Sequence, residues 1–197
     1  MRRNAVRGGD VLDALITAVA ELDAWSTLLP LTSAMSHDSL RLFAERPTVH
    51  TDTVLAAITD AALDGGQWVN LLPLAAHLPD PQLAFIATRV GEQNDDRLGD
   101  LIRDAHTAGL WTAMIPIALA QDHEGRTRVL TLIDDMDDIA EFLTALTPDT
   151  PDTAWQALIQ VRDDIPARLQ TRLAERAREL GRDDDADDLA PLRTTAN

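Results

Sequence analysis

The stretch Trp68-Val69-Asn70-Leu71-Leu72-Pro73-Leu74 has counterparts at 25–31, 111–117 and 155–161. Tryptophan opens all four, at positions 25, 68, 111 and 155, so consecutive ones lie 43, 43 and 44 residues apart. The columns upstream agree as well: thirteen residues before the tryptophans stand Leu12, Leu55, Leu98 and Phe142, and ten before stand Leu15, Ile58, Leu101 and Ala145. A register kept across so many columns indicates an internal repeat of about 43 residues.

Each repeat is expected to contain three short helices, as the second one illustrates. Residues 52–64 carry apolar side chains at helical spacing behind an aspartate and end at Gly65-Gly66. Residues 67–78 are almost entirely apolar, which indicates a helix buried on most sides. Asp80-Pro81 is a start signal for a third helix that closes at Gly91. Sustained alternation of apolar and polar residues does not occur, so strands are not predicted.

A repeat of this length, built from helices too short to be stable alone, resembles the armadillo and HEAT group of α-solenoids. The Gly65-Gly66 turn followed by Pro73-Leu74 is similar to the armadillo pattern. The resemblance implies an all-α, right-handed solenoid of four three-helix repeats. We place these at residues 10–51, 52–93, 94–136 and 137–181, between a flexible N-terminal arm (1–9) and an acidic C-terminal tail (182–197).

The repeated tryptophans and prolines have a structural interpretation that we favour over a functional one. Trp25, Trp68, Trp111 and Trp155 are expected to pack between units rather than to stack on a ligand, because large aromatic side chains dominate core burial. Pro30, Pro73 and Pro116 are expected either to kink a helix or to mark its start, since proline cannot donate the helical hydrogen bond. The fourth unit has Gln160 at this position, as a terminal unit could.

Composition restricts the classes of function. The 197 residues include 33 acidic and 17 basic side chains, all of the latter arginine, and the formal net charge is −16. This charge argues against nucleic-acid binding, which normally needs a basic surface. There is no cysteine, and no apolar run reaches the length that spans a membrane. We therefore expect a cytoplasmic protein that has no cofactor and does not bind membranes.

Two charged segments are the candidate contact surfaces. Four carboxylates crowd into five residues at Asp134, Asp135, Asp137 and Asp138, which we interpret as a solvated turn or an acidic contact surface. Arg168, Arg172 and Arg176 step by four along the last predicted helix and form a second candidate face. The five histidines, among them His37 and His123 in one repeat column, show no metal-site spacing and are expected at the surface or in turns.

Three hypotheses for function follow. The first is a non-enzymatic adaptor that binds a protein partner, which the acidic charge predicts to be basic. The second is an enzyme, of the HEAT-like DNA-repair type or another, that uses scattered Asp, Glu and Arg side chains in a concave groove. The third is a module that associates with itself. Motifs for nucleotide binding or nucleophilic catalysis are lacking, so we expect no enzymatic activity, while the oligomeric state stays open.

Overall fold

The protein is all-helical over the residues that the computed structural model describes, namely 2–22, 24–136 and 139–191, with side chains from residue 12 onward. These residues form thirteen α-helices, one short 3₁₀ helix and no strand. In chain order they are α1 (Arg2–Glu21), α2 (Trp25–Thr32), α3 (His37–Ala44), α4 (Asp52–Asp64), α5 (Trp68–Ala75), α6 (Asp80–Gly91), α7 (Asp95–Thr107), α8 (Trp111–Leu119), α9 (His123–Asp135), α10 (Ile139–Ala145), α11 (Asp152–Gln160), η1 (Arg162–Asp164), α12 (Ala167–Glu179) and α13 (Asp183–Leu189).

Local sequence signals explain where many helices begin and end. Ser36, Asn94 and Asp122 cap α3, α7 and α9 by accepting a hydrogen bond from the backbone amide three residues later. Gly66 follows α4 with φ of 64° and Gly109 follows α7 with φ of 68°. Such positive angles favour glycine, so these two residues allow the chain to turn into the next helix.

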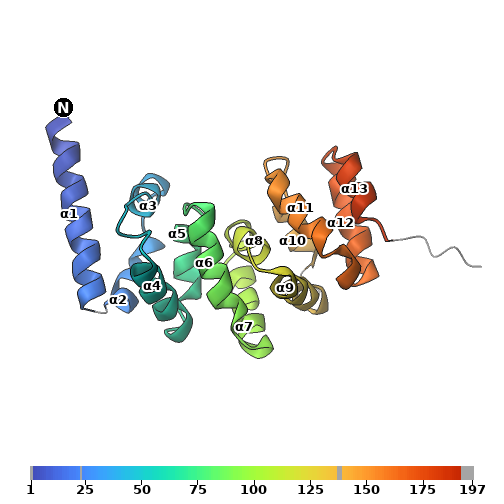
Figure 1. The fold of residues 1–197 in the computed structure, drawn as a ribbon, viewed down its shortest axis with the longest axis horizontal. Coiled ribbons are helices and arrows are strands. Elements are labelled where there is room, and N and C mark those ends of the chain that lie inside the picture. The colour runs from blue at the N-terminus through green and yellow to red at the C-terminus, as the bar shows by residue number, and fades with distance from the viewer. Residues whose placement is uncertain (1, 23, 137–138, 192–197) are drawn as a thin grey trace, which may run out of the picture.

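The helices succeed one another in an elongated row (Figure 1). The main contacts join helices that are at most three positions apart in the chain order. Helices α2, α5, α8 and α11 contact one another in succession and form a central line through the row. An array whose main contacts are between near neighbours is compatible with a helical repeat fold, as the periodic sequence predicts.

All four tryptophans lie in the core, as expected of packing residues: Trp25, Trp68 and Trp155 are at most 1% exposed and Trp111 is 5% exposed. Helices α2, α5 and α8 begin at their tryptophans and continue past the proline five residues later. The prolines therefore do not mark helix starts.

Pro30 shows how a proline inside a helix is accommodated here. Proline has no N–H, so the carbonyl of Ser26 four residues earlier loses its usual helical donor. That carbonyl instead accepts a hydrogen bond from the side-chain amide of Gln67, at 2.9 Å, from the start of the next tryptophan segment. The proline thus creates a polar link between α2 and α5.

Both ends of the chain differ from the sequence-based expectation. Helix α1 begins at Arg2, within residues 1–9, which we expected to form a flexible arm. Residues 183–189 of the expected acidic tail form α13, which packs on α11 and α12 and buries Ala186 and Leu189 completely. The prediction overlooked that Ala186 and Leu189, three residues apart, give this acidic segment a narrow apolar side.

Candidate functional site

The two charged segments predicted as separate contact surfaces are joined to each other. Asp134 lies in the last turn of α9 and is only 2% exposed, although we expected a solvated turn. Its Oδ2 atom accepts a hydrogen bond from Nε of Arg168 at 2.6 Å, and its carbonyl accepts one from Nη2 of Arg168 at 2.7 Å. A carboxylate at a helix C-terminus is unfavourable by itself, and the guanidinium compensates for this. Asp134 is therefore a structural residue.

Of the other two arginines of this face, Arg176 also serves the fold. Arg176 on α12 donates two hydrogen bonds to the carbonyl of Leu146, just past α10, at 2.8 and 3.2 Å, and pairs with Glu179 at 2.9 Å. Arg172 is exposed beside a shallow pocket. Arg168 thus binds the carbonyl of Asp134 in the last turn of α9, and Arg176 binds the carbonyl of Leu146 just past α10. Positive charge is favourable at both places, because the carbonyls at a helix C-terminus carry partial negative charge.

Only one member of the predicted acidic cluster reaches an open surface in the described part of the chain. Asp137 and Asp138 lie outside the described residues. Asp135 is exposed and lines an open groove of about 590 Å³, which we call the α9 groove. Its lining residues come from the start of α7, one side of α9 and the end of η1: Asp95, His123, Glu124, Thr127, Arg128, Thr131, Leu132, Asp135 and Asp164.

The sequence of α9 explains why its side chains share the groove. His123, Thr127, Thr131 and Asp135 recur every four residues, and this spacing places side chains on one side of a helix. The hydroxyls of Thr127 and Thr131 each donate to the carbonyl one turn earlier, at 3.0 and 2.8 Å. The two hydroxyl protons are thus used within α9. The acidic group on this side of the helix is Asp135, and the other charged groups of the groove are Asp95, Glu124, Arg128 and Asp164.

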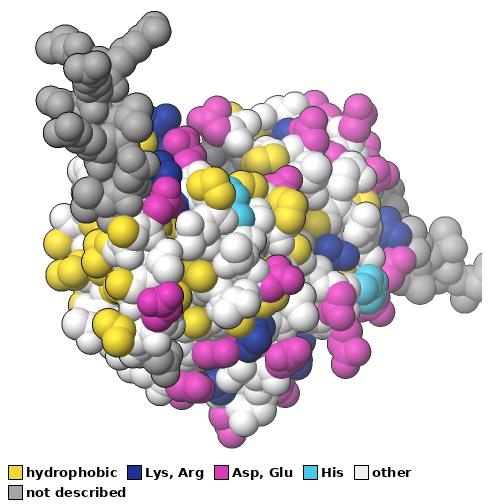
Figure 2. Space-filling view, turned by 60° about the vertical axis from the view of Figure 1, so that its left-hand side comes forward, with side chains coloured by type: hydrophobic (Ala, Val, Ile, Leu, Met, Phe, Trp, Pro, Cys, Tyr) yellow, Lys and Arg dark blue, Asp and Glu magenta, His cyan; other side chains and the backbone are white. Residues whose placement is uncertain are grey.

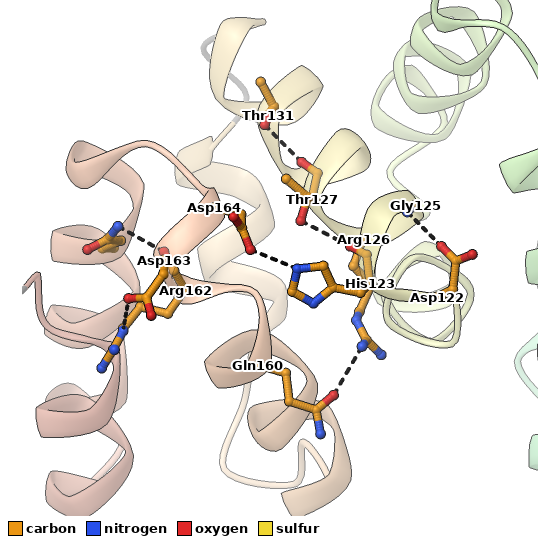
Figure 3. A network of polar contacts seen from close by, with 11 residues as sticks. Asp122, His123, Gly125, Arg126, Thr127, Thr131, Gln160, Arg162, Asp163 and Asp164 are labelled. Atoms are coloured by element: carbon orange, nitrogen blue, oxygen red, sulfur yellow. Dashed lines mark hydrogen bonds and ion pairs between the residues drawn. The ribbon is translucent and has the colours of Figure 1, made fainter.

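One wall of the groove is fixed by a contact between distant parts of the chain (Figure 3). Nε2 of His123, at the start of α9, lies 2.7 Å from Oδ2 of Asp164 in η1. Nearby, Arg126 donates from Nη2 to the side-chain oxygen of Gln160 on α11 at 3.0 Å. Asp122 caps the helix through the amide of Gly125 at 2.8 Å. The contacts of His123 and Arg126 hold η1 and α11 against the N-terminus of α9, while the Asp122 cap fixes where α9 begins.

The α9 groove carries an excess of negative charge. Four carboxylates line it, from Asp95, Glu124, Asp135 and Asp164, against one arginine. That arginine, Arg128, pairs with Asp95 at 3.1 Å and donates to the carbonyls of Gly91 and Gln93 at 3.0 and 2.5 Å. The positive charge of Arg128 is therefore compensated by Asp95 and the two carbonyls. The carboxylates that remain can attract cationic side chains to the groove.

Sequence reasoning found Asp135 in this groove but missed the other acidic groups. The four-residue spacing from His123 to Asp135 is visible in the sequence and could have identified this side of α9. The partner of His123 could not have been found in this way, because Asp164 lies 41 residues further on and depends on how η1 packs. Among the described residues no three His, Asp or Glu side chains gather in a way that could hold a metal ion.

A second, mainly apolar hollow of about 480 Å³ lies among α6, α8 and the segment from the end of α10 into α11. Its apolar wall includes Leu83, Ile115, Pro116 and Leu119, while Asp80 and Asp149 also line it. An apolar hollow with a few polar groups is the usual form of a binding pocket. Its volume is large enough to hold an apolar side chain.

Comparisons with models of protein families, with curated proteins and with solved structures find no match to this chain. Within the described residues, none of the helices combines the length and the apolar character needed to cross a membrane.

Proposed function

We propose that this chain is a non-enzymatic adaptor that binds a basic segment of another protein in the α9 groove. The observation that carries the proposal is the gathering of four carboxylates around one open groove with a single, already paired arginine. We further propose that the scaffold is a right-handed, armadillo/HEAT-like solenoid of four three-helix repeats, which the 43-residue spacing of the tryptophans supports. Such arrays commonly bind partners along an extended surface.

Electrostatic attraction would act in two ways on such a partner. The net charge of −16 attracts a basic protein from a distance and accelerates encounter. Within the groove, the exposed carboxylates of Glu124, Asp135 and Asp164 would pair with lysine or arginine side chains. Such exposed pairs contribute about 0.2–1 kcal/mol each and weaken as salt increases. Three of them together correspond to roughly a tenfold change in affinity.

The test compares two variants of equal net charge. The groove variant carries Glu124→Gln, Asp135→Asn and Asp164→Asn. The control variant carries Asp38→Asn, Asp104→Asn and Asp187→Asn, which are exposed and lie outside the groove. Binding of a short peptide rich in lysine and arginine is measured by stopped-flow fluorescence at low and moderate salt. We expect the groove variant to lose about tenfold in affinity and the control variant about twofold or less.

Equal losses in the two variants would overturn the α9 groove as the binding site, because they would show attraction by net charge alone. Binding that does not change with salt would overturn the electrostatic mechanism and direct attention to the apolar hollow. The alternative of a DNA-repair type of enzyme has less support, since Arg128, Arg168 and Arg176 are paired with carboxylates or backbone carbonyls. Such an enzyme would need a basic groove.

A further inference from the structure

The apolar hollow and the α9 groove are linked by a third, smaller hollow of about 280 Å³. One side of α6 lines first the apolar hollow and then the smaller one, with residues at the spacing that places side chains on one side of a helix: Asp80, Leu83, Ala84, Ala87, Thr88 and Gly91. The opposite wall continues in the same way, from residues 119–120 at the end of α8 to residues 121–122. Glu124 and Arg128 on α9 line both the smaller hollow and the α9 groove. The three hollows therefore follow one another along the surface, and we call them together the α6 path.

The α6 path is acidic from end to end. Asp80 and Asp149 line the apolar hollow, and the smaller hollow adds Glu92 and Asp122 to the carboxylate of Glu124. Among the described residues that line the path, the only arginine is Arg128, which Asp95 and two carbonyls already compensate. The side chains of Asp80, Glu92 and Asp149 are exposed and pair with no other described residue. These charges oppose an anionic occupant and match a basic one.

Negative charge by itself does not distinguish one surface of this protein from another, because acidic side chains are spread over the face that Figure 2 shows. The apolar hollow does differ from its surroundings. Leu83, Ile115 and Leu119 form part of its wall, and its volume of about 480 Å³ lies within the range of roughly 300–1,000 Å³ that is usual for ligand pockets. A segment that carried only charged side chains would leave this hollow to water, whereas a large apolar side chain would remove its wall from water.

The length of α6 sets the distance between the two ends of the path. At about 1.5 Å per residue, Ala84 and Asp80 in the apolar hollow lie about 11 and 16 Å along the helix axis from Gly91 in the smaller hollow. Glu124, the first carboxylate of the α9 groove, lines the same smaller hollow as Gly91. An extended chain advances about 3.3 Å per residue, so about three to five residues connect the apolar hollow with the α9 groove.

We propose that the basic segment bound in the α9 groove also carries a large apolar residue, which fills the apolar hollow and lies about three to five residues from the nearest basic residue of that segment. This inference rests on the proposed function and adds the feature that separates the partner from other basic proteins. The carboxylates attract the segment and accelerate its encounter, whereas the apolar hollow contributes affinity that salt does not screen.

Three fluorescent peptides test the inference on the full chain. All contain the same cluster of lysine and arginine with flexible polar residues beside it. The first has leucine four residues from the cluster, the second has leucine next to the cluster, and the third has serine in place of leucine. Each is made with the extra residue on either side of the cluster, because the path fixes the spacing and not the direction of the bound chain. Fluorescence anisotropy gives the dissociation constants at low and moderate salt.

We expect the peptide with the distant leucine to bind about tenfold more tightly than the serine peptide, because a leucine side chain is buried. Leucine next to the cluster cannot reach the apolar hollow, so this peptide should bind within about twofold of the serine peptide. Salt should weaken the binding of all three peptides. The ratio between the distant-leucine and serine peptides should stay constant, since screening acts on charges and not on the apolar contact.

The substitution Ala84→Gln tests the apolar hollow itself. Ala84 is exposed and lines the hollow, so a glutamine there narrows the space and makes it polar without disturbing the core. It should reduce the advantage of the distant leucine to about twofold or less and leave the affinity for the serine peptide unchanged. The control Ala18→Gln makes the same change at an exposed position on α1, outside the hollow, and should keep the full advantage.

The outcomes separate this inference from the proposed function. Equal affinities for the distant-leucine and serine peptides, together with a loss of affinity in the Glu124→Gln/Asp135→Asn/Asp164→Asn groove variant, would overturn this inference alone. A leucine advantage that persists in Ala84→Gln would also overturn it, by placing the leucine elsewhere. If the groove variant bound every peptide as tightly as the original protein does, the α9 groove would be overturned as the binding site, and with it the spacing argued from α6.

Discussion

Asp134 and Arg168 bind each other through two hydrogen bonds that join the C-terminus of α9 to the first turns of α12. The guanidinium contacts the carboxylate with Nε and the main-chain carbonyl of the same aspartate with Nη2. The aspartate is buried while the arginine side chain is 60% exposed. One guanidinium thus neutralises a buried carboxylate and satisfies a carbonyl at the end of a helix, where positive charge is favourable.

Replacing Asp134 with asparagine should destabilise the fold. The substitution removes the charge that the Arg168 guanidinium binds but keeps the size of the side chain. We expect the free energy of unfolding to fall by about 1.5–3 kcal/mol, the range for a hydrogen bond to a charged group. Urea denaturation followed by circular dichroism measures this loss.

Asp135→Asn is the matched control, since it removes the same charge one residue later from an exposed side chain. It should change the free energy of unfolding by no more than about 0.5 kcal/mol. If both variants unfold at the same urea concentration, the pair of Asp134 and Arg168 does not stabilise the protein. Asp134 would then again be a candidate contact residue.

Trp68→Ala should lower the free energy of unfolding by about 3–5 kcal/mol, because Trp68 is fully buried between helices in the middle of the row. Trp68→Phe keeps most of the apolar volume and removes an indole N–H that has no hydrogen-bond partner. It should cost less than about 1.5 kcal/mol. If Trp68→Ala and Trp68→Phe lowered the free energy of unfolding equally, the apolar volume of the side chain would not be what stabilises the protein at this position. Emission from a variant with Trp68 as its single tryptophan should be that of a buried indole.

Helix α13 should contribute to stability, against the expectation from its composition. Leu189 is completely buried, and Arg162 donates to the carbonyl of Asp188 at 2.7 Å. Deleting residues 183–197 should lower the melting temperature by about 5–15 °C, and Leu189→Ala should account for a large part of this change. Asp187→Asn, which alters an exposed charge on the same helix, should leave the melting temperature within about a degree or two.

The sequence allowed the fold class to be predicted because the repeat is carried by buried residues. Tryptophan and leucine recur at the same positions of each repeat because each helix must pack against its neighbours in the same way. This recurrence can be seen in the sequence alone. Asp134 and Leu189 were misread for the opposite reason. Both lie in segments rich in aspartate, where composition suggests solvent exposure, and their burial depends on Arg168 and α11. The α9 groove was missed in part because Asp164 reaches His123 through packing that has no local signature.

We expect the stability of the protein to depend on pH through His77. His37, at the start of α3, and His77, in the turn after α5, meet edge to face with their ring centroids 4.4 Å apart. Burial lowers the pKa of His77 below its ordinary value of 6.5, and the nearby His37 and Arg41 lower this pKa further. The unfolded chain therefore binds a proton at this residue at a higher pH than the folded chain does. It follows that the free energy of unfolding decreases as the pH falls through about 6.5 and continues to decrease until the folded state also becomes protonated.

His77→Gln removes the titrating group. The melting temperature of this variant should therefore change less than that of the original protein between pH 7.5 and pH 5.5, a range that extends roughly one unit to either side of an ordinary histidine pKa. Differential scanning calorimetry of both proteins across this range measures the difference, and parallel pH profiles would exclude His77 as the source of the dependence.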